Sequence, residues 1–159
     1  MNIEADKIVT FRLGDDHFAA DIHAVERVLR YSAPTPVPDM PAYIEGVMDY
    51  QHRVLPVVNL RRRFEMPAVD VRTETRTLVL NVGGEWIGVV VDSVTEVVSF
   101  DPEAVAPPPK LFRGLAGEYI KGIVRRGSRL VIYLDVEQLL SSTERIALQA
   151  AGAEALANG

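Results

Sequence analysis

Apolar and polar positions alternate in short runs along most of the chain. Residues 9–13 form one such run, and Leu78–Val82 and Ile87–Val91 form others that are rich in β-branched side chains. This period of two is typical of half-buried strands, whereas an amphipathic helix repeats its apolar positions every three or four residues. Polar segments that contain glycine, at 14–17 and 83–85, separate consecutive runs and predict hairpin turns. The pattern therefore predicts an all-β fold.

The alternating pattern occurs twice. Val9–Gly14 aligns with Leu78–Gly83, 69 positions later, and Tyr43–Val47 aligns with Tyr119–Ile123, 76 positions later. The larger second offset fits a longer connector in the second copy. Two blocks that repeat in the same order indicate a duplicated chain. We divide it into a tail of residues 1–7, a first half of 8–76, a second half of 77–141 and a C-terminal segment of 142–159.

Each half contains about five short strands by this pattern. A sheet this small hides its apolar face best by curling into a barrel, which also removes exposed edges. We therefore expect two barrels related by a pseudo-two-fold axis, with Gly14 equivalent to Gly83 and Gly46 equivalent to Gly122. The first strand is free to cross to the other barrel, which would move the boundary between the barrels by several residues.

Proline and helix signals refine this picture. Pro56 interrupts a strand-like run and predicts an edge position or a bulge, because proline cannot donate a ladder hydrogen bond. From Ser142, a capping residue, an acidic first turn and an alanine-rich stretch predict a short terminal helix. We expect this helix to fray at Gly152 or beyond.

Composition narrows the class of protein. The 159 residues are 48% hydrophobic and 25% charged, as in an ordinary globular protein, with a formal net charge of −5. A nucleic-acid binder would carry a basic excess, so we expect no nucleic-acid partner. The chain has no cysteine, no apolar run long enough for a membrane span and no signal-peptide pattern. These features favour a cytoplasmic location and argue against direct membrane insertion.

Patterns for catalysis and metal binding are missing from the sequence. The histidines His17, His23 and His52 are dispersed, and no HExxH, phosphate-binding loop or GxGxxG motif occurs. The acidic residues between 15 and 21 lack the other ligands of a calcium loop. No serine lies in the setting of an activated nucleophile. We therefore expect a protein that is not an enzyme, with no cofactor and no bound metal.

Two further features each have two interpretations. The run Arg61-Arg62-Arg63 is either a solvated face or a docking surface for an acidic partner protein. The triplet Pro107-Pro108-Pro109 is either a rigid connector or a polyproline ligand. At the level of sequence both questions stay open.

Several blocks in a fixed order resemble the CheW family of chemotaxis coupling proteins. They are Phe11–Gly14, Ala20–Ile22, Tyr43–Val47, Arg53–Arg61, Val89–Val97, the proline triplet, Tyr119–Ile123 and Leu134–Val136. The resemblance covers about residues 8–141 and implies two five-stranded SH3-like barrels without enzymatic activity. It further implies an adaptor that binds the cytoplasmic tip of chemoreceptors and the regulatory domain of the histidine kinase CheA. Ring-like arrays with other CheW-like domains, at the inner face of the membrane, are implied as well.

The chain departs from this family at one turn. Asp49-Tyr50-Gln51-His52 stands where the family usually carries Asn-Leu-Arg-Gly, near the receptor-binding surface. The planar charged fork of the arginine and the backbone freedom of the glycine are both lost. We therefore expect this protein to bind a different receptor subset, or to serve a different pathway.

The resemblance and the repeat together suggest two sets of partner-binding residues. The receptor set is Ile22, Val25, Arg27, Gly46, Gln51, Arg53, Val94 and Val97, of which Ile22, Val25, Val94 and Val97 are expected to line a groove between the barrels that accepts a receptor helix. The kinase set, expected on barrel-end strands, is Leu55, Val57, Arg61, Arg62, Leu130 and Tyr133. The apolar members of the groove have an alternative interpretation as ordinary core. The alternatives for function are an auxiliary scaffold of a non-motility chemosensory pathway and a generic peptide-binding β-barrel module.

Overall fold

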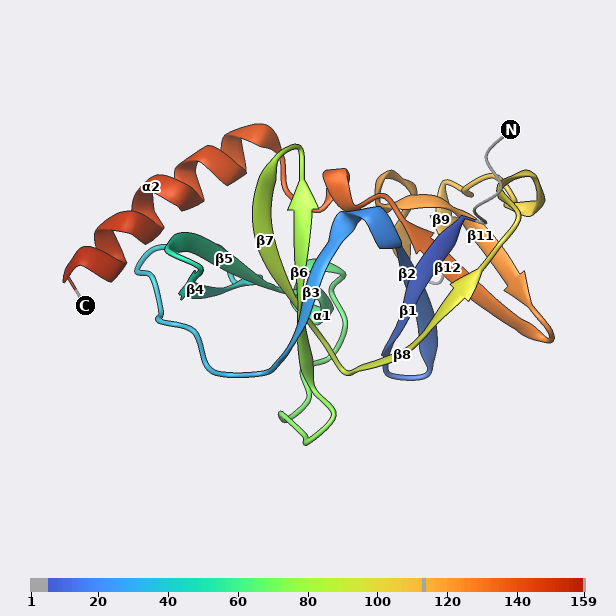
Figure 1. Ribbon diagram of the computed structural model, residues 1–159, viewed down its shortest axis with the longest axis horizontal. Coiled ribbons are helices and arrows are strands. Elements are labelled where there is room, and N and C mark those ends of the chain that lie inside the picture. The colour runs from blue at the N-terminus through green and yellow to red at the C-terminus, as the bar shows by residue number, and fades with distance from the viewer. Residues whose placement is uncertain (1–5, 113, 159) are drawn as a thin grey trace.

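The computed structural model describes residues 6–112 and 114–158, which form strands and one long helix (Figure 1). The strands are β1 (Lys7–Leu13), β2 (Asp16–Asp21), β3 (Val25–Arg30), β4 (Ile44–Tyr50), β5 (Arg53–Asn59), β6 (Arg76–Val82), β7 (Glu85–Val91), β8 (Ser93–Ser99), β9 (Leu111–Phe112), β10 (Leu115–Ala116), β11 (Ile120–Arg126) and β12 (Arg129–Leu134). The helices are α1 (Leu60–Arg63) and α2 (Ser142–Asn158), and short 3₁₀ turns lie at Ile22–Ala24, Pro102–Ala104, Gly117–Tyr119 and Val136–Gln138. Within these ranges, no helix is long and apolar enough to cross a membrane. Most of the N-terminal tail expected at 1–7 lies outside the described residues.

Ten of the described strands form two five-stranded sheets, each of which combines strands from both halves of the sequence, and β9 and β10 form a separate two-stranded sheet. One sheet, here called the β1 sheet, has the order β11-β12-β2-β1-β8; the other, the β6 sheet, has the order β3-β6-β7-β5-β4. The two lie side by side along the long axis of the molecule (Figure 1). Hairpin β1–β2 leaves the first half to join strands of the second, and hairpin β6–β7 does the reverse. The sequence halves 8–76 and 77–141 are therefore not the two barrels.

The sequence repeat has the same geometry in both sheets. Replacing β1, β2, β3, β4 and β5 by β6, β7, β8, β11 and β12 converts one strand order into the other. Even the parallel pairs correspond, because β12 pairs with β2 as β5 pairs with β7. Gly14 and Gly83 occupy matching hairpin turns, with φ of 62° and 60°. The prediction of two SH3-like barrels in a pseudo-two-fold arrangement is confirmed.

A second pair of glycines lies where each connector meets its sheet. Gly46 and Gly122 mark matching irregularities in the β4–β5 and β11–β12 pairs. The residue after each glycine forms an isolated bridge with the preceding connector. A Cβ atom at Gly46 would lie 2.2 Å from the carbonyl oxygen of Thr35, and one at Gly122 would lie 2.8 Å from that of Ala106. Only glycine fits so close to the connector, and the predicted equivalence of the pair holds.

Three groups of buried side chains form the core. The largest fills the space between the sheets and draws residues from both, including Phe11, Leu78 and Ile87. A smaller group lies against the β1 sheet around Val131, and another lies against the β6 sheet around its repeat counterpart Leu55. The shared core joins the two barrels into one unit, because each barrel leaves an apolar surface that the other covers.

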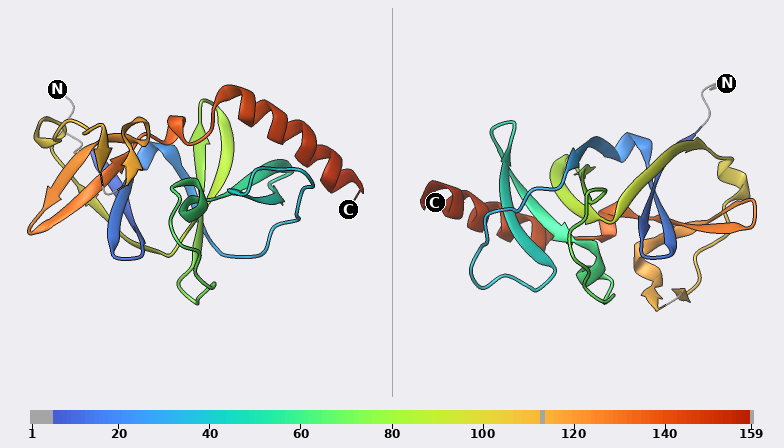
Figure 2. Two further views of the ribbon diagram at one scale, coloured as in Figure 1. Left: turned by 180° about the vertical axis from the view of Figure 1, so that it is seen from behind. Right: turned by 90° about the horizontal axis from the view of Figure 1, so that it is seen from below.

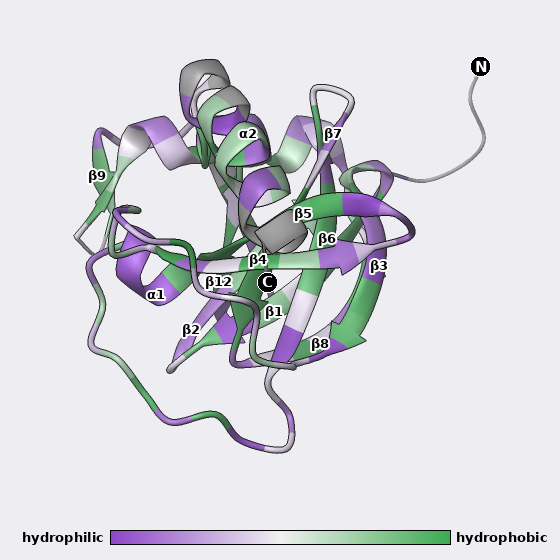
Figure 3. Cartoon of the chain, turned by 90° about the vertical axis from the view of Figure 1, so that its left-hand side faces the viewer, coloured by the Kyte–Doolittle hydropathy of each residue, from purple (hydrophilic) through white to green (hydrophobic). Residues whose placement is uncertain are grey.

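Helix α2 lies across β4 and β5, at one end of the molecule (Figure 3). Ser141 and Glu144 form a capping box at its start: Ser141 Oγ accepts the Glu144 N–H at 3.1 Å, and Glu144 Oε1 accepts the Ser141 N–H at 2.8 Å. The helix continues through Gly152 to Asn158 instead of fraying at that glycine. A Cβ atom at Gly152 would lie 2.6 Å from Val54 Cγ1, so the glycine lets the helix approach the sheet closely.

Pro56 lies in an interior strand, since β5 pairs with both β4 and β7. The predicted edge position is therefore wrong for the strand as a whole. Pairing with β7 starts only at Val57, opposite Gly88, so the missing N–H of Pro56 leaves no ladder bond unmade on that side. The irregularity of the β4–β5 pair falls on the opposite strand, between Ile44 and Gly46.

Candidate partner-binding surfaces

The residues predicted to line a groove, Ile22, Val25, Val94 and Val97, lie in β3, in β8 and in the turn before β3, where the chain passes between the two sheets. Val25 begins β3 and Val94 lies near the start of β8, and both strands are edges of their sheets. Both valines are half-buried and pack against the shared core, and Ile22 is half-buried as well. Val97, further along β8, is 54% exposed. The junction thus combines a half-buried apolar floor with an exposed apolar side chain.

One exposed residue at this junction was absent from the predicted receptor set. Val28 on β3 is the repeat counterpart of Val97 and is 42% exposed. Arg27, beside it, is exposed too. The 69-residue offset already pairs the two valines, but alternation within an edge strand does not reveal which positions face water.

Gln51 and Arg53 lie elsewhere on the β6 sheet, at the turn between β4 and β5. The guanidinium carbon of Arg53 is 4.3 Å from the centre of the Trp86 ring, and the Tyr50 ring centre is 5.4 Å from that of Trp86. Gln51 and His52 have φ of 49° and 64°, in the left-handed region that non-glycine residues rarely adopt. Two consecutive positive φ values are those of a type I′ turn, which favours Asn-Gly. The departure from the family motif therefore produces a strained turn with two exposed polar side chains.

Several residues predicted to contact partners are buried instead. Gly46 is packed under Thr35, and the side chains of Leu55, Val57 and Tyr133 are at most 6% exposed. Four consecutive residues are buried in each of β5 and β12, on both faces of the strand, so these side chains pack inside the protein. The members of the kinase set that remain accessible are Arg61, Arg62 and Leu130.

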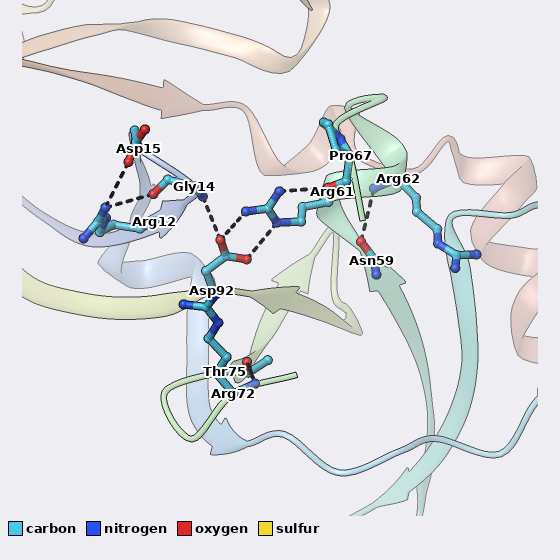
Figure 4. Close-up of polar contacts among 10 residues, drawn as sticks. All are labelled: Arg12, Gly14, Asp15, Asn59, Arg61, Arg62, Pro67, Arg72, Thr75 and Asp92. Atoms are coloured by element: carbon cyan, nitrogen blue, oxygen red, sulfur yellow. Dashed lines mark hydrogen bonds and ion pairs between the residues drawn. The ribbon is translucent and has the colours of Figure 1, made fainter. Parts of the chain in front are cut away.

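Arg61 links the two sheets (Figure 4). Its Nε and Nη2 donate to Asp92 Oδ1 and Oδ2 at 2.9 Å and 2.5 Å, a bidentate ion pair. The Gly14 N–H, in the β1–β2 turn, donates to Asp92 Oδ2 at 2.7 Å, and Arg61 Nη1 donates to the Pro67 carbonyl oxygen at 2.8 Å. Arg61 therefore has a structural partner already, although it was expected to contact the kinase.

Electrostatics reinforce this link. Burial by itself would raise the pKa of the Asp92 carboxyl, but the hydrogen bonds from Arg61 and Gly14 outweigh burial and the pKa is lowered. The hydrogen bonds to Asp92 raise the pKa of Arg61. Both groups are therefore charged at neutral pH, and the pair holds α1, the β1–β2 turn and the start of β8 together.

A second link joins α2 to the rest of the molecule. The repeat counterparts Tyr43 and Tyr119 flank Arg63, whose guanidinium carbon is 4.1 Å and 5.6 Å from their ring centres. Arg63 Nη2 lies 3.2 Å from Glu144 Oε1, and the Tyr43 hydroxyl donates to Glu144 Oε2. Burial and the hydrogen bond to Glu144 raise the pKa of Tyr43. The first turn of α2 is thus tied to α1 and to the connectors before β4 and β11.

The segment of residues 64–75, which joins the two sequence halves, projects from the centre of the molecule (Figure 2). Val69 and Val71 in this segment are 51% and 57% exposed. A cavity of about 300 Å³ separates the segment from the β1–β2 turn. Charged residues of both signs line it, namely Arg12, Asp15, Arg61, Asp70, Arg72, Glu74 and Asp92.

The described residues contain no group of three or more His, Asp or Glu side chains that could hold a metal ion. His17 lies in β2, His23 in the turn before β3 and His52 in the β4–β5 turn. Burial and the positive charge of Arg129 lower the pKa of His17. The histidines thus occupy three separate places and do not converge on one site.

Two barrels that exchange hairpins, with accessible residues grouped at the sheet junction and at the turns, define a duplicated SH3-like binding module. Residues 7–144 match the family described as CheW-like domain. The chain belongs to this family, as its sequence blocks predicted.

Known relatives agree with this assignment. The chain is 32% identical over 148 residues to the chemotaxis protein CheW of Treponema pallidum, covering 91% of this chain and 87% of that protein. It is 34% identical over 138 residues to the chemotaxis protein CheW of Klebsiella aerogenes, covering 87% and 83% of the two chains. The crystal structure of the scaffolding protein TtCheW from Thermoanaerobacter tengcongensis superposes with a TM-score of 0.83 at 25% identity, over 90% of this chain and 92% of that one.

Proposed function

We propose that this protein is a non-catalytic adaptor that couples chemoreceptors to the histidine kinase CheA in chemotaxis. The observation that carries the proposal is the CheW-like domain over residues 7–144, shared with chemotaxis and scaffolding proteins. The architecture supports the proposal because two barrels offer separate surfaces, so that one molecule can hold two partners. The protein would act in the cytoplasm, where the receptor tips lie, at arrays on the inner face of the membrane.

The receptor surface is assigned to the junction of the sheets. Val28 and Val97 present exposed apolar side chains on the two edge strands, and Val25 and Val94 form a half-buried floor. An amphipathic helix can lay its apolar face on these side chains, with its polar face toward solvent. Arg27, exposed on β3, supplies a charge at the rim for an acidic residue of that helix.

The kinase surface is assigned to the barrel ends. Arg62 follows β5 of the β6 sheet and is exposed, whereas Leu130 in β12 of the β1 sheet is half-buried. Because the two residues belong to different sheets, the molecule offers one contact at each barrel. The regulatory domain of CheA would bind one of them, and a second CheW-like domain at the other would extend a ring-like array.

The β4–β5 turn is assigned a role in receptor choice. Gln51 carries no charge, and His52 adds a side chain where the family has glycine. Replacing both by the family residues, Gln51→Arg with His52→Gly, should change the order in which the receptors of the cell bind. An unchanged order of affinities would exclude this turn as a determinant of specificity.

The central experiment is co-sedimentation of the purified protein with membranes that contain the cell's own receptors, with and without CheA. Val97→Glu should lower receptor binding by about tenfold, because it places a carboxylate among the exposed apolar side chains of the proposed receptor surface. Stability should stay close to that of the wild type, since Val97 is 54% exposed. Leu111→Glu is the matched control, because Leu111 is 64% exposed on β9, away from β3 and β8. If Val97→Glu and Leu111→Glu both bind receptors as the wild type does, the junction is not the receptor surface.

A further inference from the structure

A concave basic surface lies where β3 ends and β6 begins. A cavity of about 460 Å³ is lined by Arg30, Tyr31, Arg72, Thr73, Thr75 and Arg76, here called the basic cleft. Three of the six residues are arginines and none is acidic. The neighbouring cavity beside Asp92 has acidic and basic residues together. The basic cleft thus differs in charge from the rest of a chain whose net charge is −5.

The positive charges of the basic cleft are not neutralised within the described residues. Arg30 and Arg76 are direct partners across the β3–β6 pair, and like charges placed opposite one another destabilise a sheet. In the described part of the chain, no carboxylate oxygen lies within 4.0 Å of the guanidinium nitrogens of Arg30, Arg72 or Arg76. Arg76 is held by backbone carbonyl oxygens, which carry no full negative charge, so the two opposed positive charges point to an anionic ligand from outside.

Two carboxylates accept hydrogen bonds from residues of the cleft, and both are engaged by hydroxyl groups: Glu74 Oε2 accepts the Thr73 hydroxyl at 2.9 Å, and Glu45 accepts that of Tyr31. Glu45 Oε2 accepts the Tyr31 hydroxyl at 2.9 Å, and Glu45 Oε1 accepts Asn59 Nδ2 at 2.8 Å. Burial and the hydrogen bond to Glu45 raise the pKa of Tyr31 to about 12, so its hydroxyl stays a donor. Glu45 therefore serves Tyr31 and Asn59 and leaves the arginines for another anion.

The backbone of the basic cleft is held in place before any ligand binds. Arg76 Nη1 donates to the carbonyl oxygens of Thr73 and Thr75 at 2.7 Å and 3.0 Å. The Arg72 N–H donates to Thr75 Oγ1 at 2.9 Å, which closes the turn between residues 72 and 76. These bonds use only Nη1 of Arg76. A guanidinium fixed on one edge loses less entropy when its other nitrogens bind an anion.

Exposed apolar side chains lie in the same segment. Val69 and Val71 are 51% and 57% exposed, and Val69 lines the hollows on the other side of Arg72 and Thr75. An open cleft with arginines beside exposed valines suits a polypeptide that carries both carboxylates and apolar side chains. A phosphate compound alone would make no use of the valines.

We propose that the basic cleft binds an acidic segment of a partner protein, with its carboxylates held by Arg30 and Arg76 and an apolar side chain against Val69 and Val71. Guanidinium groups present paired N–H donors that match the two oxygens of a carboxylate. The inference does not depend on the receptor and kinase surfaces assigned above, because it uses none of their residues.

The test measures fluorescence anisotropy of a labelled peptide of about ten residues that alternates glutamate and leucine, a spacing suited to an extended segment. The wild type should bind it saturably, and Arg30→Ser should weaken binding about tenfold through loss of one charge-assisted contact. Arg125→Ser is the matched control: it removes the same charge from an exposed strand position of the β1 sheet, and it should change affinity less than about twofold.

Two further variants separate the parts of the proposal. Arg76→Lys keeps the charge but not the fork and should weaken binding, with unchanged thermal unfolding showing that the turn persists. Val69→Ser with Val71→Ser should weaken binding of the Glu-Leu peptide but not of a Glu-Ser peptide.

Three results would overturn the proposal. The first is no saturable binding of the Glu-Leu peptide even at low salt. The second is equal loss of affinity in Arg30→Ser and Arg125→Ser, which would mean unspecific attraction. The third is tighter binding of pyrophosphate than of the peptide, with the same dependence on Arg30, which would make the basic cleft a phosphate site.

Discussion

The turns β4–β5 and β11–β12 hold the same place in the two barrels, yet their chemistry differs. In the first, Tyr50 lies opposite Arg53, and Arg53 stacks on Trp86. In the second, Arg126 lies opposite Arg129, a like-charge pair at the tip of the hairpin. Each turn contains at least one residue with a left-handed backbone, but the turn does not determine the side chains next to it, so these differ between the two barrels. One duplicated position can therefore be packed and aromatic in one barrel, and open and basic in the other.

Helix α2 widens this difference. Gln149 Nε2 donates to the Val54 carbonyl oxygen at 3.1 Å, so the helix is bound to the β4–β5 hairpin. Leu130, the repeat counterpart of Val54, is half-buried without a helix over it in the described residues. Helix α2 thus covers the β4–β5 hairpin at one end of the molecule, whereas no helix of the described chain covers the β11–β12 hairpin at the other end. An adaptor with this asymmetry can bind different partners at two ends that share one fold.

The largest expected effect comes from the two connector glycines. Gly46→Ala should destabilise the protein by about 3–5 kcal/mol, because its Cβ would lie 2.2 Å from a backbone oxygen and its φ of 150° is strained for other residues. Gly122→Ala should lose less, about 2 kcal/mol, since its Cβ would lie 2.8 Å from the backbone oxygen of Ala106 and its closest contact, Val105 Cγ1, is a side-chain atom that can turn away. Urea unfolding measures both. Equal losses would show that the two barrels hold their connectors in the same way.

Removing the buried contact of α2 should affect the barrel of β4 and β5 more than the other. Leu148 is 4% exposed, so Leu148→Ala should cost about 2–3 kcal/mol. Hydrogen exchange should speed up most in β4 and β5, because α2 packs against this pair, and less in β11 and β12, which Leu148 reaches through the shared core. Ala150→Ser, at an exposed position of the same helix, is the control. Equal acceleration in all four strands would contradict a local cap.

Acid should weaken two ion pairs, Arg61 with Asp92 and Arg63 with Glu144. The pKa of Asp92 and that of Glu144 are lowered in the folded state, because hydrogen bonds and opposite charges outweigh burial. As the pH falls, Asp92 and Glu144 are therefore protonated in the unfolded chain, at about pH 4, before they are protonated in the folded protein. The stabilisation is fully present above that pH and is lost as the pH falls through the lower folded-state pKa values.

Two variants separate the links. Asp92→Asn should lose about 1–2 kcal/mol at neutral pH, a value discounted for the partial exposure of the pair. It should also flatten the pH dependence of unfolding below pH 4. Glu144→Gln should flatten the pH dependence of unfolding to a smaller extent. A pH profile unchanged in both variants would mean that other carboxylates control acid unfolding.

The smallest effect concerns the turns themselves. Gln51→Asn with His52→Gly should stabilise the protein by about 0.5–1 kcal/mol, because these residues suit two consecutive positive φ values. Gly127→Gln in the opposite turn, where φ is 61°, should destabilise it by about 1 kcal/mol. Thermal unfolding of the two variants gives the sign. A loss of stability in the Asn-Gly variant would show that Gln51 or His52 makes a contact that offsets the strain.

The sequence predicted the features that local patterns determine. Period-two runs located the strands, and matching glycines located the equivalent turns and bulges. The reciprocal exchange of hairpins was anticipated only for the first strand, because pairing of Ile8 with Val98 depends on register between distant segments. Membership of the CheW-like family was predicted from ordered blocks and is confirmed.

The partner-binding residues stay predictions, and the structure adds where their side chains lie. Residues 55–58 of β5 are all buried, so alternation could not separate a core face from an exposed face at Leu55 and Val57. The partner of Arg61, Asp92, is 31 positions away and no local pattern connects them. The basic cleft depends on Arg30 lying beside Arg76, which only the folded sheet reveals. The choice of receptors and pathway stays a prediction.

The exchange of hairpins also sets the order in which the protein can fold during synthesis. All strands of the β6 sheet lie between residues 25 and 91, so this barrel is continuous in the chain. It is inserted into the β1 sheet, whose strands β1 and β2 come before it and β8, β11 and β12 after it. The β1–β2 hairpin is made first but finds β12, its parallel neighbour, only after residue 134 has been added. The edges of this hairpin therefore stay unpaired while the inserted barrel forms. Pairing between such distant segments slows folding, and unpaired strand edges favour association with other nascent chains.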